Sequence, residues 1–243
     1  MTHTSGALQA YVQFLEQSRK PFTGLNVTDL LSAELGAILA GPCSSVTLER
    51  AIDSALAANV PVSHVESVLL HLAAYAGLAA AECGQAALES VVARNAHLPV
   101  QPRLVLNSIP SSRAGRIDFG FAAYRRFHPT RPEEQAPRFE PLSPDYYPGG
   151  MELMSHTFGD SNLPLRTREV ASIACLAALG SCPDQLLFHL GIGMREGITQ
   201  VQLAGVLLLV QVHAGVPRAH NAAVMAAQLL AMQTSSTAIP TGN

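Results

Sequence analysis

Cys182 and His189 lie in the stretch CPDQLLFHLGIGMREGIT, which spans residues 182–199. A separation of seven residues places two side chains on the same face of an α-helix. Histidine titrates near neutral pH and suits proton transfer, and a thiol near a helix N-terminus tends to have a lowered pKa. The stretch therefore has two interpretations, a reactive pair that faces a cavity or an ordinary buried histidine and thiol.

Helix-ending and helix-starting residues around this stretch predict the elements that must position the pair. Ser181 is expected to cap the helix that carries Cys182 and His189, with Pro183 in its first turn. Thr199 and Gln202 have the spacing of a capping box for the next helix. The remaining boundaries are indicated by Pro164, Gly180, Gly197, Gly215 and Pro217.

The chain also repeats a pattern of a helix, a glycine stop and a second helix. The two copies are VPVSHVESVLLHLAAYAGLAAAECGQAALESVV, residues 60–92, and ITQVQLAGVLLLVQVHAGVPRAHNAAVMAAQLL, residues 198–230. Gly77 matches Gly215, which gives an offset of 215 − 77 = 138 residues. Such self-similarity predicts two similar units in tandem, although chance similarity between Ala/Leu-rich helices is the alternative.

No stretch alternates at a period of two residues, so an all-α protein is predicted. The segment His128–Gly150 is rich in proline and is expected to be an extended connector. We therefore divide the chain into an N-terminal helical unit (1–98), a short helix plus a Pro-rich connector (99–150), and a C-terminal helical unit (151–243).

Composition narrows the possible partners. The chain has 243 residues, of which 48% are hydrophobic and 14% charged, which favours a core-rich protein and a homo-oligomer, most simply a dimer or trimer. A net charge of −3 without a basic run argues against nucleic-acid binding. No apolar stretch is long enough to span a bilayer, so no membrane association is expected.

The cysteines and histidines do not have metal-site spacing. The four cysteines are scattered without a CxxC pair, so reduced thiols in a cytoplasmic protein are expected. The nine histidines form no His-x-x-x-His pattern. Neither a metal site nor a cofactor is predicted.

Three motifs in combination resemble the carboxymuconolactone decarboxylase family, part of a wider group of alkyl hydroperoxidase-like helical proteins. They are LPLRTRE, LLFHLGIGMREGIT and VLLLVQVHAGVPRAHNAA, between Leu163 and about Leu230. The resemblance implies an all-helical unit of a kind that assembles into rings or is fused in tandem. The N-terminal unit resembles a degenerate copy, with Ala51 where the helix histidine would be.

The chain departs from the hydroperoxidase branch of this group at one decisive position. That branch has a CxxC pair just before the helix histidine, and here Gln185 takes the place of the second cysteine. A peroxidase of that type is therefore not expected. Gln202 and Gly205 also stand where the decarboxylase branch tends to have acidic residues, which points away from the family's usual substrate.

Several residues have candidate roles around His189, which would transfer the proton. Glu169 would orient His189, although an acidic residue also interacts favourably with a helix N-terminus. Arg166 and Arg168 would hold a substrate carboxylate, or form surface salt bridges instead. Cys182 would relay a proton or simply pack.

Four more residues are candidates for substrate binding. Arg126, next to Arg125, offers a second anion site. His71, Tyr75 and His213 lie near the glycine stops of the two repeats and either line a cavity between the repeats or belong to the core.

These residues favour a cofactor-free, decarboxylase-like lyase that acts on a small oxygenated carboxylate or lactone, such as a natural-product intermediate. Decarboxylation leaves an enolate-like carbanion, which needs a donor for the oxyanion and an acid to protonate carbon. The alternatives are an isomerase or cyclase of specialised metabolism, or a non-catalytic helical binding or scaffold protein.

Overall fold

The computed structural model describes residues 24–42, 44–95, 102–106, 109–127, 132–159 and 163–237, together with Gly6, Ala10, Gln13 and Phe14. Helices dominate this part of the chain, and no strand occurs within it. The predicted all-α fold is therefore confirmed.

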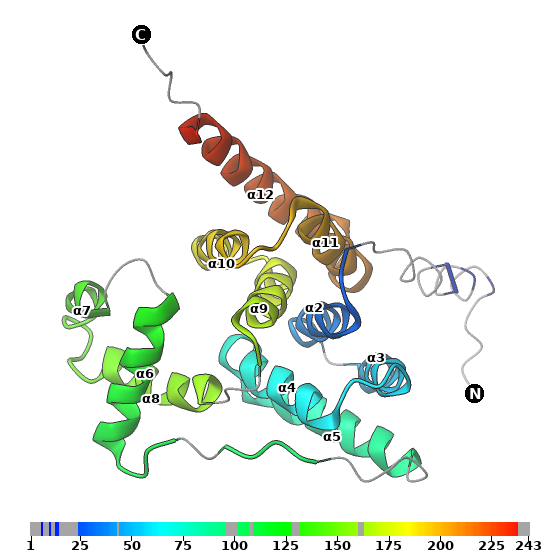
Figure 1. The fold of residues 1–243 in the computed structure, drawn as a ribbon, viewed down its shortest axis with the longest axis horizontal. Coiled ribbons are helices and arrows are strands. Elements are labelled where there is room, and N and C mark those ends of the chain that lie inside the picture. The colour runs from blue at the N-terminus through cyan, green and yellow to red at the C-terminus, as the bar shows by residue number, and fades with distance from the viewer. Residues whose placement is uncertain are drawn as a thin grey trace. The chain divides into compact units, whose positions relative to one another are not determined.

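The helices follow one another in the order shown in Figure 1. They are α2 (Val27–Leu39), α3 (Ser45–Ala57), α4 (Val62–Ala76), α5 (Leu78–Arg94), α6 (Arg113–Phe127), α7 (Pro132–Gln135), the 3₁₀-helix η1 (Ala136–Arg138), α8 (Tyr146–Phe158), α9 (Leu165–Leu179), α10 (Pro183–Arg195), α11 (Gln200–Ala214) and α12 (Val216–Thr237). No helix of the described ranges is both long and apolar enough to cross a membrane.

The chain forms two compact units, which we call unit 1 (Met1–Pro42 and Glu169–Asn243) and unit 2 (Cys43–Arg168). In unit 1, α11 packs against both α2 and α12, and α10 packs against α12. In unit 2, α5 packs against α3 and α4, and α8 packs against α4 and α6. Unit 1 joins both ends of the sequence, because α2 packs against α11. The division into segments 1–98, 99–150 and 151–243 stays a prediction.

Helix boundaries follow the predicted glycines and caps. The backbone of Gly180 has φ 72° and that of Gly215 has φ 91°, a region that glycine enters at little cost. The capping box is present, with bonds of 3.3 Å from Gln202 N to Thr199 Oγ1 and 2.9 Å from Thr199 N to Gln202 Oε1. These predictions are confirmed.

Two local predictions are wrong. Cys182, not Ser181, is the N-cap of α10, and its side chain makes no capping hydrogen bond. Helix α8 begins at Tyr146, inside the segment predicted to be extended. Pro148 is compatible with this helix because it lies in the first turn, where its missing N–H has no intrahelical partner.

The expectation that all cysteines are reduced is also wrong, because Cys83 is disulfide-bonded. Cys175 and Cys182 are free thiols, as expected. Cys43 lies outside the described residues.

The order of helices recurs at one spacing. Helices α2, α3, α4 and α5 begin at residues 27, 45, 62 and 78, and α9, α10, α11 and α12 begin at 165, 183, 200 and 216. Each pair of starts differs by 138 residues, for example 165 − 27 = 138. This spacing equals the 138-residue offset of the sequence motifs. It supports the tandem repeat, which stays a prediction.

Helix α2 lies close to α9 within unit 1 at a glycine. A Cβ atom on Gly36 would lie 2.5 Å from the carbonyl oxygen of Ala171 and 3.1 Å from the backbone nitrogen of Cys175. Neither backbone atom can move without displacing α9. Gly36 therefore sets the distance between the two helices.

We expect Gly36→Ala to lower the free energy of unfolding by about 1–3 kcal/mol, the usual cost of overpacking. Gly191→Ala is the matched control, because its Cβ would meet nothing closer than 3.9 Å. It should leave stability unchanged or raise it by up to about 1 kcal/mol through helix propensity. Urea unfolding of both variants checks this, and equal stabilities would contradict it.

Candidate active site

Helices α9 and α10 bring Glu169 and His189 together inside unit 1. The Nδ1 atom of His189 lies 2.7 Å from Oε2 of Glu169. Both side chains are largely buried, with exposed fractions of 12% for His189 and 4% for Glu169. The structure therefore places the two residues predicted to form the acid–base pair in direct hydrogen-bond contact.

A glycine one turn after His189 allows this contact. A Cβ on Gly193 would lie 2.9 Å from the side chains of Ile173 and Ile198, and 3.7 Å from Cβ of Glu169. Without that Cβ, α10 lies close against the face of α9 that carries Glu169. Helix packing thus holds the imidazole against the carboxylate.

The direction of the hydrogen bond fixes the role of each ring nitrogen. A carboxylate only accepts hydrogen bonds, so Nδ1 of His189 carries a proton and its N–H donates a hydrogen bond to Glu169. In the neutral ring, Nε2 is then the nitrogen without a proton, and it can accept a hydrogen bond.

Cys182 is half-buried at the N-cap of α10, seven residues before His189. Its Sγ atom lies 3.7 Å from Oγ of Ser181. The other free thiol, Cys175, is fully buried in α9, and burial raises its pKa to about 12, with a smaller effect from Cys182. Cys175 therefore stays a protonated thiol at neutral pH, and Cys182 is the more accessible of the two.

Arg168 does not have the surroundings of a substrate clamp. It is 4% exposed, and its guanidinium donates to the carbonyl oxygens of Leu163 (3.1 Å) and Thr157 (2.6 Å). The same group lies 5.9 Å from the ring centre of Phe158. The donors of Arg168 therefore bind the backbone around the junction of α8 and α9.

His71 and Tyr75 belong to the cluster around Arg168 in unit 2. Nε2 of His71 donates to the carbonyl oxygen of Arg168 over 3.2 Å, and Nδ1 faces the Nη1 atom of Arg168 at 3.4 Å. Since the guanidinium can only donate, Nδ1 is the accepting, unprotonated nitrogen. His71 is therefore a neutral histidine, fully buried, with the ring of Tyr75 5.1 Å away.

The other residues predicted to bind substrate are Arg166, Arg126 and His213. Arg166 is half-buried in the first turn of α9, and Arg126 is exposed in the last turn of α6. His213 is in unit 1, where its Nε2 atom lies 3.1 Å from Oε1 of Glu34 on α2. The predicted cavity between the repeats stays a prediction.

Sequence reasoning missed Glu34, the buried partner of His213. One signal was available, because Glu34 is an acidic residue inside LLSAELGAIL, the otherwise apolar core of α2. A buried carboxylate requires a partner, but the sequence does not show that the partner lies 179 positions away.

The described residues contain no group of three or more His, Cys, Asp or Glu side chains placed to hold a metal ion. The expected absence of a metal and of a cofactor stays an expectation.

The family model of the carboxymuconolactone decarboxylase family matches residues 144–228. This segment belongs to that family. The carboxymuconolactone decarboxylase segment contains Glu169, Cys182, His189 and His213 and extends from just before α8 into α12. No curated protein matches the chain significantly.

We expect Arg168→Met to lower the free energy of unfolding by at least about 1.5–3 kcal/mol, the worth of a hydrogen bond to a charged group. Arg126→Met is the matched control and should change stability by no more than about 0.5 kcal/mol, because Arg126 is exposed. Chemical denaturation measures both. A similar effect of the two variants would show that the bonds of Arg168 contribute little to stability.

Proposed function

We propose that this chain is an enzyme that uses His189 as an acid–base group to decarboxylate a small oxygenated carboxylate or lactone without a cofactor. One observation carries the proposal: the 2.7 Å hydrogen bond between His189 and Glu169, inside the carboxymuconolactone decarboxylase segment. General acid–base catalysis requires a titratable group whose orientation is fixed, and Glu169 fixes that of His189.

The chemistry requires a substrate whose carboxylate is on the carbon next to a carbonyl group, as in a β-keto acid. The bond to the carboxyl carbon breaks, CO₂ leaves, and the electron pair remains as an enolate. The protonated Nε2 of His189 then delivers its proton to the enolate carbon, and the neutral ring regains a proton from solvent. Glu169 stabilises the imidazolium by keeping Nδ1–H hydrogen-bonded in both forms.

Arg166 is the cation that we assign to the substrate carboxylate. It precedes Glu169 by three residues on α9, so the two residues lie one turn apart on the same face of the helix. Guanidinium groups bind carboxylates through two parallel hydrogen bonds, which also orient the substrate. Of the two arginines predicted to bind the substrate carboxylate, we therefore retain Arg166.

The test is release of CO₂ from a simple β-keto acid, compared for the wild type and three variants. His189→Gln removes the titratable nitrogen and should lower kcat/KM by about 10²–10⁴. Glu169→Gln keeps an acceptor but removes the charge, so its loss should be smaller. Cys182→Ser should have the smallest effect, because a hydroxyl still forms a hydrogen bond.

Two results would contradict the proposal. An unchanged kcat/KM in His189→Gln would mean that His189 is a packing residue. A complete loss of activity in Cys182→Ser, with His189→Gln active, would mean that the chemistry depends on the thiol. Circular dichroism of each variant separates these outcomes from loss of the fold.

A further inference from the structure

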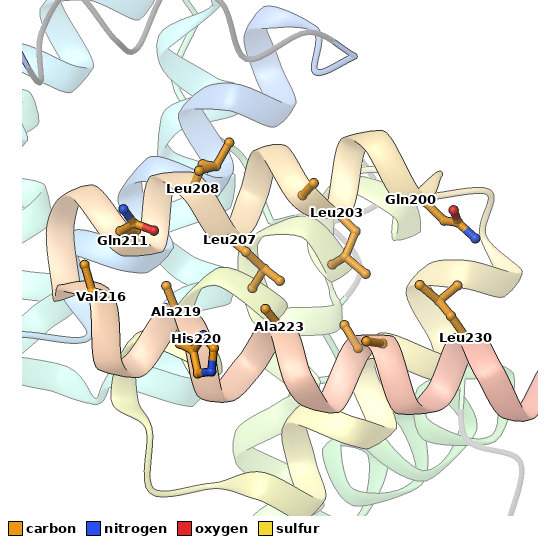
Figure 2. A pocket seen from close by; sticks show the side chains of 13 residues that line it. Gln200, Leu203, Leu207, Leu208, Gln211, Val216, Ala219, His220, Ala223 and Leu230 are labelled. Atoms are coloured by element: carbon orange, nitrogen blue, oxygen red, sulfur yellow. The ribbon is translucent and has the colours of Figure 1, made fainter.

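An open apolar groove runs between α11 and α12 in unit 1 (Figure 2). Its volume is about 430 Å³, within the range of about 300–1,000 Å³ that is typical of small-molecule sites. Leucine and alanine side chains form most of its wall, and none of the described residues that line it is an Asp, Glu, Lys or Arg. The groove therefore favours a ligand with an extended apolar part.

Two polar side chains meet at one end of the groove. Gln211 lies in the last turn of α11 and His220 in the second turn of α12, and both are exposed. Figure 2 shows them on facing helices at the end near Val216, whereas Leu230 and Gln200 lie at the other end. The amide of Gln211 and the imidazole of His220 each have an N–H that can donate to an oxygen atom. This end therefore suits an oxygen-bearing head group, and the wall beyond it suits an alkyl chain.

Unit 2 provides an internal comparison, because α4 and α5 begin 138 residues before α11 and α12. Four alanines that line the groove correspond to longer side chains in unit 2. The pairs are Ala204 with Glu66, Ala223 with Gln85, Ala226 with Leu88, and Ala227 with Glu89. Because these four side chains end at Cβ in unit 1, the space between α11 and α12 stays open.

The longer side chains of unit 2 also hold a segment of the chain. Glu66 and Glu89 both form ion pairs with Arg103, and the backbone nitrogen of Leu104 donates to Glu66 over 2.6 Å. This segment is thus bound to α4 and α5 through carboxylates. The alanines at the corresponding positions of unit 1 cannot form such ion pairs, so the groove keeps its apolar wall available to a ligand.

The polar end of the groove differs from unit 2 in charge. His220 corresponds to Glu82, and Gln211 corresponds to Ala73. Unit 2 therefore has a carboxylate and a methyl group where unit 1 has an imidazole and an amide. A carboxylate there would repel an anionic head group, whereas the imidazole and the amide can both donate to it. The two ends of one ligand are thus indicated by separate differences, a carboxylate at this end and an alkyl chain along the alanines.

We propose that the groove binds a fatty carboxylate, with its head group at Gln211 and His220 and its alkyl chain directed toward Leu230. Between Gln200 and Gln211 the groove follows 211 − 200 = 11 residues of α11, which is about 16 Å at about 1.5 Å per residue. With C–C bonds of about 1.5 Å, an extended chain of about twelve carbons is about 14 Å long. Burial of the chain supplies the affinity, and the two donors fix its direction.

The test is isothermal titration calorimetry with dodecanoate, below its micelle concentration, for the wild type and three groove variants. Ala226→Leu and Ala223→Gln put the side chains of unit 2 into the groove, and His220→Glu puts a carboxylate at the head-group end. Ala231→Leu and Gln228→Glu are the matched controls, because both positions are exposed on α12 and neither lines the groove.

We expect the wild type and both controls to bind dodecanoate with the same Kd, below about 100 µM. Each groove variant should raise Kd at least about tenfold with unchanged circular dichroism. Hexanoate should bind the wild type at least about tenfold more weakly than dodecanoate, because each fully buried CH₂ group contributes a factor of about four. 1-Dodecanol should also bind more weakly, because it lacks the charged acceptor.

Any of three results would overturn the inference. The first is no binding of dodecanoate to the wild type at about 1 mM. The second is an unchanged Kd in Ala223→Gln, which is informative even if Ala226→Leu fails to fold, because Ala223 is exposed. The third is binding of 1-dodecanol as tight as that of dodecanoate. None of these results depends on the chemistry proposed for His189, because the variants are scored by binding alone.

Discussion

A buried carboxylate is costly unless a partner compensates for its lost hydration, and Glu169 is a buried carboxylate of this kind. His189 provides that compensation across the contact between α9 and α10. The pair therefore requires the two helices to stay close, which Gly193 allows by lacking a side chain. The same contact that satisfies the carboxylate also orients the imidazole for proton transfer, so packing and the proposed chemistry rest on one interaction.

Arg168 and Glu169 are adjacent in α9 but bind different partners. Arg168 binds the backbone at Leu163 and Thr157 and the ring of His71, whereas Glu169 binds His189. Successive helical residues point about 100° apart, so one helix can hold a structural cation and the carboxylate that binds His189 side by side without pairing them. Arg168 stabilises the junction that leads into α9, and Glu169 acts on the next helix.

The sequence predicted most helix ends because glycine, proline and capping residues act locally, as at Gly180, Thr199 and Gly215. The contact of Glu169 with His189 was predicted from a resemblance to a known family. The surroundings of Arg168 were not, because backbone carbonyls are its main partners and every residue has one. The pairing of Glu34 with His213 depends on the tertiary position of α2, which local patterns do not encode.

The proposed role of His189 depends most on which ring nitrogen is protonated, which ¹⁵N-edited NMR of the imidazole rings measures directly. Resonances of His189 are assigned by their loss in His189→Gln. We predict that the neutral ring is protonated at Nδ1, with a slowly exchanging, downfield Nδ1 proton that reflects the hydrogen bond to Glu169. A neutral ring protonated at Nε2 would contradict the account, because Glu169 would then have no proton to accept from His189.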